Sequence, residues 1–234
     1  MLEHSYQPRL VEARFATRVN RFVASVLVDG QERFAHLPTS GRLRELLVNG
    51  AQVWLRPTPG EDRRTPYSLE LVRSCEGELV SINSQLPNRL MERWLEQGRF
   101  PAFSHYAEVQ REPSLGEGRA DLRLVGSDGD CLIEVKSVTL VVGGEARFPD
   151  APTSRGARHL RELAIARSEG RRAAVFFVIQ RSDAVSFAPN RATDPNFADE
   201  LKQAFDSGVE ISAITCCVST EGVLLGNEVP IVLA

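Results

Sequence analysis

The segment RADLRLVGSDGDCLIEVKS, residues 119–137, contains two runs of alternating apolar and polar residues separated by a turn sequence. Such alternation is typical of β-strands with one buried face, and it predicts strands over Arg119–Val125 and Cys131–Ser137. The residues between them, 126–130, are Gly, Ser, Asp, Gly and Asp, which adopt positive φ angles readily or bond to their own backbone. The segment therefore predicts a β-hairpin.

The hairpin register decides which side chains meet. If Val125 pairs with Asp130, then Asp121 lies directly opposite Glu134, and Lys136 shares their face. Directly opposed Cβ atoms are about 5 Å apart, so two carboxylates repel there unless a positive charge lies between them. Either a divalent metal ion lies between the two carboxylates, or the face is solvated and Lys136 neutralises Glu134. The remaining strand residues follow the same alternation: Arg123 joins the acids, while Leu122, Leu124, Ile133 and Val135 point to the opposite face.

Lys136 is one of only two lysines in the chain, since nearly all of the positive charge comes from arginine. Lysine is a compact cation whose pKa shifts when it is desolvated, whereas arginine stays charged. The arrangement Asp121-x12-Glu134-x-Lys136 across a hairpin matches the catalytic core of the PD-(D/E)XK nucleases. In those enzymes the acids hold Mg²⁺ and the lysine assists the attacking water. The short pattern alone has low specificity, because it arises often by chance.

Composition is that of an ordinary globular protein: 234 residues, 42% hydrophobic, 25% charged. The net charge of −3 argues against a surface that is basic throughout, although it allows a local basic cleft. No apolar run approaches the roughly 20 residues that a membrane helix needs. The first eight residues lack the basic and apolar regions of a signal peptide. We therefore expect a cytoplasmic protein with no membrane partner.

The four cysteines, at positions 75, 131, 216 and 217, show no metal-ligand spacing, which argues against a structural zinc site. Cys131, Cys216 and Cys217 fall in apolar strands, and we expect them to be small core residues.

The sequence of residues 1–83 predicts a barrel of short strands and one short helix over Gly41–Val48. Leu43, Leu46 and Leu47 are expected on the buried side of this helix. A five-stranded barrel of the oligonucleotide-binding (OB) type is the expected form. The predicted strands are Val11–Val19, Arg21–Asp29, Arg33–Leu37, Ala51–Arg56, Tyr67–Arg73 and Glu78–Asn83.

Residues 84–234 alternate between helical and extended patterns, which predicts an α/β domain with a mixed sheet flanked by helices. The expected fold class is thus α+β. A first helix carries Leu90, Trp94 and Leu95 on one side and ends at Gly98. Further predicted helices are Ala157–Arg167, capped by Thr153 or Ser154, and Asn196–Ser207. Further predicted strands are His105–Gln110, Ala173–Gln180 and Val209–Val218.

Four motifs closely resemble the sugar fermentation stimulation protein A family: CLIEVKSVTL at 131–140, FPDAPTSRGARHLREL at 148–163, HLPTSGRL at 36–43 and NRL at 88–90. Thr39-Ser40 stands where that family has Asn-Thr, and Ala120 where the nuclease motif has Pro. The resemblance implies an OB-like barrel joined to a PD-(D/E)XK nuclease-like domain. It also implies DNA binding without sequence preference and a suggested regulatory role in maltose and sugar utilisation.

With this resemblance, Asp121, Glu134 and the carbonyl of Val135 are the expected ligands of Mg²⁺ or Mn²⁺, and Lys136 is the expected catalytic lysine. Glu108, or alternatively Glu92, is the candidate for completing the metal shell.

The expected nucleic-acid contacts are His36, Arg42 and Arg44 in the barrel, and Arg155 and His159 near a helix N-terminus that favours phosphate. Trp54 or Tyr67 could serve as a stacking platform, although core packing is favoured for Trp54. Asp150 either caps the helix or touches the cleft.

These features support two main hypotheses: a Mg²⁺-dependent nuclease acting on DNA, and a DNA-binding regulator that keeps the nuclease fold without turnover. A small-molecule enzyme that uses the same metal pocket is the third.

Overall fold

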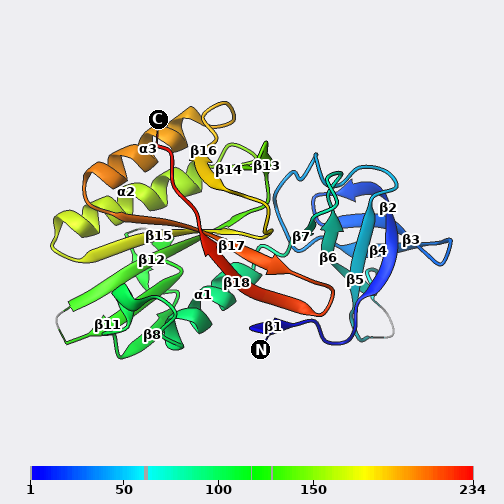
Figure 1. Ribbon diagram of the computed structural model, residues 1–234, viewed down its shortest axis with the longest axis horizontal. Helices are drawn as coiled ribbons and strands as arrows, with labels where there is room; N and C mark the ends of the chain where they lie inside the picture. The colour runs from blue at the N-terminus through cyan, green and yellow to red at the C-terminus, as the bar shows by residue number, and fades with distance from the viewer. Residues whose placement is uncertain (1, 61–62, 117, 128, 234) are drawn as a thin grey trace.

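Residues 11–81 form a five-stranded barrel with one additional strand, and the rest of the chain forms an α/β domain beside it (Figure 1). The computed structural model describes residues 2–60, 63–116, 118–127 and 129–233. The strands of the barrel and its extension are β2 (Val11–Asn20), β3 (Val23–Val28), β4 (Gln31–His36), β5 (Gln52–Pro57), β6 (Tyr67–Arg73) and β7 (Leu79–Ser81).

The barrel closes through a parallel pairing of β4 with β6, in which Ala35 lies opposite Tyr67. The other pairings are antiparallel and follow the order β4-β3-β2-β5-β6, with β7 added to β6. Ala24, Val26 and Val53 point inward and belong to the apolar core of the barrel. The predicted OB-type barrel is therefore confirmed.

The segment 41–48 is not helical, in contrast to the prediction. Leu43 adopts a positive φ of 49°, which interrupts a helix, and Leu46 N and Leu47 N both bond back to Leu43 O in local turns. Leu43 and Leu46 are buried as expected. The apolar spacing thus predicted which residues face the core but not the backbone conformation.

The second domain contains a seven-stranded mixed sheet in the order β1-β18-β17-β15-β12-β11-β8. The parallel central strands are β12 (Gly129–Val138), β15 (Arg172–Ile179) and β17 (Glu210–Val218). The antiparallel outer strands are β1 (His4–Ser5), β8 (Glu108–Arg111), β11 (Leu122–Gly126) and β18 (Gly222–Glu228). The chain thus starts in this sheet through β1, passes through the barrel and then returns.

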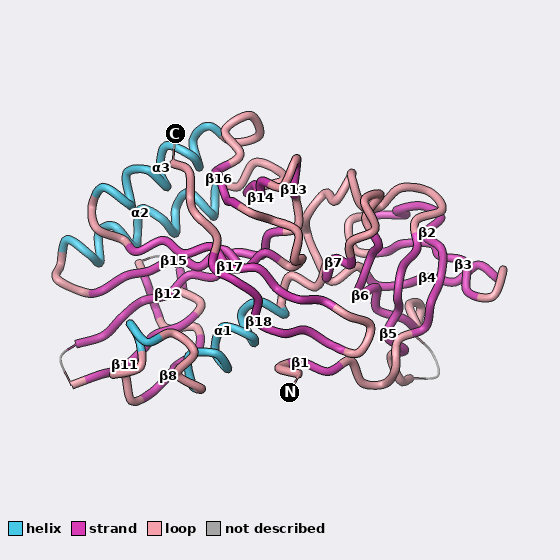
Figure 2. Tube along the Cα trace, in the orientation of Figure 1, coloured by secondary structure: helices cyan, strands magenta, loops and turns pink. Residues whose placement is uncertain are grey.

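Three helices cover the two faces of this sheet, with α2 (Ser154–Ser168) and α3 (Pro195–Asp206) on one face and α1 (Leu86–Glu96) on the other (Figure 2). Two apolar cores result, one on each face. A 3₁₀ turn follows α1 at Pro101–Phe103. The smaller strands β9 (Ser114–Leu115) and β10 (Gly118–Arg119) pair with each other, and β13 (Val141–Val142), β14 (Glu145–Phe148) and β16 (Ser186–Pro189) form a small sheet. None of the helices in the described chain is long and apolar enough to cross a membrane.

The predicted hairpin register is confirmed. Val125 pairs with Asp130 and Leu122 with Ile133, while Asp128 of the turn lies outside the described residues. Leu122 and Ile133 belong to the core beneath α1, whereas Leu132 belongs to the core beneath α2. Since Glu134 is two residues from Leu132, its side chain points to the α2 face.

Candidate active site

A cleft of about 510 Å³ lies between the barrel and the α/β domain. Three segments contribute most of its wall: the loop after β4, the end of β12 and the stretch that leads into α2. The lining includes Asp121, Glu134, Val135 and Lys136. The hairpin therefore delivers its acid pair and lysine to the boundary between the two domains.

Asp121 directly precedes β11 and both of its carboxylate oxygens accept hydrogen bonds. Asn88 Nδ2 donates to Oδ1 at 2.7 Å, and the backbone N–H of Val135 donates to Oδ2 at 2.8 Å. The pKa of Asp121 is nevertheless raised, first because the group is buried and second because Glu134 is close. Glu134 thus acts on Asp121 as a neighbouring like charge that disfavours the ionised carboxylate.

Glu134 is only 2% exposed, and two cationic or donor groups contact its Oε1. Lys136 Nζ lies 2.5 Å from that atom, and His159 Nδ1 also bonds to it. Burial pushes the pKa of Glu134 upward, but Lys136 and His159 together outweigh burial, so the net shift is downward. Lys136 and His159 thus favour the ionised form of this buried carboxylate.

The second oxygen of Glu134, Oε2, is buried and has no hydrogen-bond partner in the part of the chain that the structure describes. A buried carboxylate oxygen without a partner costs free energy, since its desolvation is not compensated. Glu134 lines the cleft beside Asp121, so a cation or donor that reached this oxygen would compensate its desolvation.

The start of α2 explains how His159 reaches Glu134. Thr153 Oγ1 caps the helix by accepting from Gly156 N, which confirms Thr153 as one of the two predicted caps. His159 follows one and a half turns later and is 2% exposed. Arg155, which is exposed, donates from Nε to His159 Nε2 at 3.3 Å. Of the two predicted nucleic-acid contacts on α2, only Arg155 is exposed, whereas His159 is buried against the acid pair.

A divalent cation that prefers oxygen fits this set of groups. Asp121, Glu134 Oε2 and the carbonyl of Val135 are oxygen donors, which Mg²⁺ and Ca²⁺ prefer. No group of three or more His, Cys, Asp or Glu side chains among the described residues is placed to hold a metal ion. The protein thus offers two carboxylates, and water or substrate oxygens would have to fill the remaining positions.

Glu108 is not part of this cluster, and the prediction that it completes a metal shell is wrong. It pairs with Val125, at the end of β11 away from Asp121. Four residues along a strand correspond to about 13 Å. Glu92, the alternative, pairs with Arg111 on β8 and does not line the cleft.

The predicted barrel contacts His36, Arg42 and Arg44 are all exposed, and none of them is in the cleft lining. Arg42 lies at its rim, because Asp150 Oδ2 accepts from the backbone N–H groups of Arg42 (2.7 Å) and Leu43 (3.3 Å). Asp150 is therefore a cleft residue that links the domains and not the cap of α2.

The two candidate stacking residues differ in exposure. Trp54 is 6% exposed and belongs to the core beneath α1, with the Arg73 guanidinium over its ring, so core packing is confirmed for it. Tyr67 is half-buried on β6.

Sequence reasoning missed the role of Asn88. The NRL motif contains this residue, but nothing in the local sequence indicates that the first turn of α1 packs against Asp121. Cys217 was also misplaced: it is exposed, while Cys131 and Cys216 are buried. Adjacent strand residues point to opposite faces, so Cys216 and Cys217 cannot both face one core.

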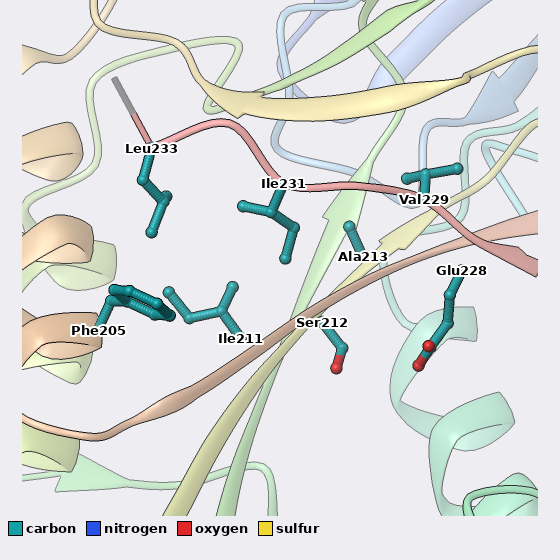
Figure 3. A pocket seen from close by; sticks show the side chains of 8 residues that line it. All are labelled: Phe205, Ile211, Ser212, Ala213, Glu228, Val229, Ile231 and Leu233. Atoms are coloured by element: carbon teal, nitrogen blue, oxygen red, sulfur yellow. The ribbon is translucent and has the colours of Figure 1, made fainter.

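A second hollow of about 340 Å³ lies between α3, β17 and the C-terminal segment (Figure 3). In Figure 3 the side chains of Phe205, Ile211, Ile231 and Leu233 gather around one end, and the Glu228 carboxylate lies at the other. Among its lining residues Glu228 is the single titratable group. This hollow has no acid pair, so the interdomain cleft is the better candidate for chemistry.

Comparison with known proteins gives consistent matches along the chain. Residues 17–82 match the family described as the SfsA N-terminal OB domain, and residues 85–222 match the sugar fermentation stimulation protein RE domain. The chain is 50% identical over 226 residues to the sugar fermentation stimulation protein homolog of Desulforamulus reducens, which covers 97% of this chain and 94% of the relative. It is 44% identical over 225 residues to the homolog of Caldanaerobacter subterraneus subsp. tengcongensis, with 96% and 97% covered.

A solved structure is also similar. The structure of Pyrococcus furiosus SfsA in complex with Ca²⁺ superposes with a TM-score of 0.91 at 30% sequence identity, and the match covers 99% of each chain. The arrangement of barrel and α/β domain is thus shared along the whole length. On these matches, the chain belongs to the sugar fermentation stimulation protein family.

Proposed function

We propose that this protein is a Mg²⁺- or Mn²⁺-dependent phosphodiesterase that cleaves DNA in the interdomain cleft. The observation that carries the proposal is the unpartnered, buried Oε2 of Glu134 beside Asp121. A protein that only bound a polyanion would gain nothing from two buried carboxylates facing it, because they repel phosphate. A cation between the carboxylates and the phosphate would offset their electrostatic repulsion.

Asp121, Glu134 and the Val135 carbonyl would hold the metal ion. When bound, the ion would act as a Lewis acid that lowers the pKa of a bound water and offsets charge that develops on the phosphate. The Ca²⁺ complex of the Pyrococcus furiosus relative supports a site for an oxygen-preferring cation in this chain too.

The surrounding residues hold the acids in place. Lys136 and His159 both contact Glu134 Oε1, which leaves Oε2 free for the ligand. Asn88 and the Val135 N–H fix both oxygens of Asp121. Lys136 also places an ammonium group at the cleft, where it would orient the attacking water or stabilise the developing phosphorane charge.

Arginines around the cleft would hold the DNA backbone. Arg21, Arg147 and Arg155 line the cleft, and Arg42 and Arg44 lie on the adjoining loop. Contacts of this kind bind phosphate irrespective of sequence, so the proposal includes DNA binding without sequence preference in the cytoplasm.

The test is incubation of the purified protein with plasmid, linear and single-stranded DNA in Mg²⁺, Mn²⁺ or EDTA. We expect metal-dependent cleavage that falls by about 10²–10⁴-fold in Lys136→Ala and disappears in Glu134→Gln, while both variants retain DNA. Glu200→Gln on α3 is the control, since its carboxylate pairs with Arg161 outside the cleft. Cleavage that persists in both site variants would contradict the proposal.

A DNA-binding regulator of sugar utilisation without turnover is the second candidate. Two observations favour it: the family is named for stimulation of sugar fermentation, and the described chain offers only two acids for a metal rather than three. DNA retention that is independent of metal, with no cleavage of any of the three substrates, would support this alternative.

A further inference from the structure

Ser137, the residue after Lys136, carries a hydroxyl group at the interdomain cleft. Its side chain is half-buried, and the residue belongs to the cleft lining. Ile133 and Val135 of the same strand belong to the core beneath α1, so the alternation along β12 turns Ser137 to the α1 side. Lys136 is turned to the other side, where it bonds to Glu134. The end of β12 therefore presents one hydrogen-bond donor on each side.

Gln180 holds this hydroxyl from inside the protein. It directly follows β15, is 1% exposed, and donates from Nε2 to Ser137 Oγ at 2.8 Å. This is the only hydrogen bond of the Gln180 amide within the described chain, where its buried Oε1 has no partner. The reverse amide orientation would put both Nε2 hydrogens at that unpartnered position, and buried N–H groups without an acceptor are the rarer defect. The amide therefore acts as a donor to Ser137.

The Gln180 bond determines the direction of the Ser137 hydroxyl hydrogen. A serine hydroxyl has one hydrogen to donate and two lone pairs that accept. Because a lone pair of Ser137 Oγ accepts from Gln180, the hydrogen points away from that amide. None of the described residues accepts it. Since Ser137 lines the cleft, its O–H is available to a ligand there.

The backbone of Gln180 is anchored independently of its side chain. Its N–H donates to Val138 O at 2.8 Å, and its carbonyl accepts from Ser81 N of β7 at 3.0 Å. The first bond ties Gln180 to the strand that carries Ser137, and the second ties it to the barrel extension. A substitution of the Gln180 side chain leaves both bonds possible, so it removes the amide without removing these anchors.

A phosphate oxygen is the acceptor that suits this hydroxyl. Phosphate oxygens only accept hydrogen bonds, and serine hydroxyls contact them in protein–DNA complexes irrespective of sequence. A further cation at this place would pair with Glu134, as Lys136 does. A neutral hydroxyl attracts phosphate and leaves the acid pair to a metal ion.

We infer that Ser137 binds a non-bridging phosphate oxygen of the nucleic acid at the end of β12, and that Gln180 is the positioning residue that aims its hydroxyl. The inference rests on the proposed function, because it takes the cleft as the place where DNA lies. It adds a neutral substrate contact to the acids, Lys136 and the arginines. Such a contact releases no counterion, so it is distinguishable from an arginine by its salt dependence.

The test measures binding of a short fluorescein-labelled DNA duplex by anisotropy in Ca²⁺ over a salt series, with a gel to confirm that the DNA stays intact. Ser137→Ala removes the hydroxyl, Ser137→Thr keeps it, and Gln180→Met removes the amide while keeping its length. The double variant of Ser137→Ala and Gln180→Met completes the cycle. Ser25→Ala is the control, because Ser25 is buried on β3, bonds to Glu32 and does not line the cleft. Melting temperatures monitor folding.

Ser137→Ala should lose about 10- to 150-fold in affinity, the range for a hydrogen bond to a charged group. Its slope of log K against log salt should equal that of the wild type, because no charge is removed. Gln180→Met should lose about 2- to 10-fold. The double variant should bind no more weakly than Ser137→Ala, since Gln180 acts through Ser137. Ser137→Thr should recover most of the affinity, and Ser25→Ala should bind like the wild type.

Wild-type affinity in Ser137→Ala, or a salt slope changed by about one unit, would overturn the phosphate contact. A double variant that shows the product of the two single losses would overturn the positioning role of Gln180.

This inference and the nuclease proposal fail separately. If Ser137→Ala binds DNA normally while the wild type cleaves it with Mg²⁺, only the inference is overturned. If Ser137→Ala binds weakly at an unchanged slope but the wild type cleaves no DNA with Mg²⁺ or Mn²⁺, the phosphate contact stands and the nuclease proposal is overturned.

Discussion

Asn88 and Asp121 are joined by a 2.7 Å hydrogen bond from Nδ2 to Oδ1, which couples the first turn of α1 to the acid that precedes β11. The other oxygen of Asp121 accepts from Val135 N. The carboxylate is therefore oriented from two elements before any ligand binds, and such support commonly decides how well a metal ligand performs.

Replacing Asn88 by alanine should weaken metal binding by about 10- to 100-fold, as is usual when a group that orients a ligand is lost. The Asn88 hydrogen bond lowers the pKa of Asp121, so its removal should raise that pKa further and increase the deficit as pH falls. Titration calorimetry with Mn²⁺ at two pH values measures both effects. Asn49→Ala is the control, because Asn49 makes a comparable bond to Ala16 O in the barrel. Equal affinity of Asn88→Ala and wild type would show that Asp121 needs no such support.

Arg155 and His159 lie on the same face of α2 but should respond differently to alanine substitution. Arg155 is exposed at the cleft, so its loss should reduce the salt dependence of DNA binding by about one unit in log K against log salt. His159 is buried on Glu134, so its loss should leave the salt slope unchanged while cleavage falls about 10- to 100-fold. Binding titrations over a salt series and initial cleavage rates give the two readouts.

The conservative variant His159→Asn is the control for His159→Ala. Its amide can donate a hydrogen bond from the place of Nδ1, so it should restore part of the cleavage rate. Melting temperatures of all three variants monitor folding. A changed salt slope in His159→Ala would mean that the imidazole reaches the nucleic acid after all.

The acid pair could be predicted from the sequence because hairpin register is a local property. The residues of the turn and the alternation of Leu122, Leu124 and Ile133 fix which residue opposes which, so the hairpin alone predicts that Asp121 faces Glu134. Their role as metal ligands was predicted only with the family resemblance. Glu108 was misassigned because the register of β8 against β11 depends on the connection through residues 112–121, which carries no comparable pattern.

Other features depend on contacts between distant segments. The backbone at Leu43 takes a positive φ where Asp150, more than a hundred residues away, accepts its N–H group. The bond from Asn88 to Asp121 likewise joins a helix to a strand. Apolar spacing predicts which side chains are buried, but it contains no information on such polar contacts between elements.

Arg181 and Asp183 form an ion pair at the domain boundary whose loss should be costly. The Arg181 side chain is 2% exposed and bonds to Asp183, while Glu76 of the barrel lies 3.4 Å away. Asp183→Asn removes the main partner of a buried cation and should lower the free energy of unfolding by about 3 kcal/mol, the low end for buried pairs because Asp183 is 28% exposed. Urea unfolding at neutral pH measures this. Asp199→Asn is the matched control, since Asp199 and Arg191 are both about half exposed and should contribute less than about 1 kcal/mol.

The ion pair between Arg181 and Asp183 should also make the free energy of unfolding depend on pH. Burial would raise the pKa of Asp183, but hydrogen bonds from Arg181 outweigh burial, and the net shift is downward. A carboxyl with a lowered pKa stabilises the fold above the ordinary aspartate pKa of about 3.9, and this stabilisation is lost as pH falls through the folded pKa. The difference between wild type and Asp183→Asn should therefore shrink in acid. A difference that stays constant between neutral pH and pH of about 3 would contradict this assignment.

The four free thiols should divide into two fast and two slow groups in their reaction with a disulfide reagent. Cys75 and Cys217 are exposed, whereas burial raises the pKa of Cys131 to about 12 and also raises that of Cys216. Thiolate is the reactive form, so the buried pair is protected both by lack of access and by protonation. We expect two thiols to react in the native protein and four in denaturant. Cys217→Ser should remove one fast thiol, and Cys216→Ser should leave the fast count unchanged. Because these residues are adjacent on β17, a fast thiol that disappears in Cys216→Ser instead would mean that the strand is turned over, with the opposite face of β17 toward the core beneath α1.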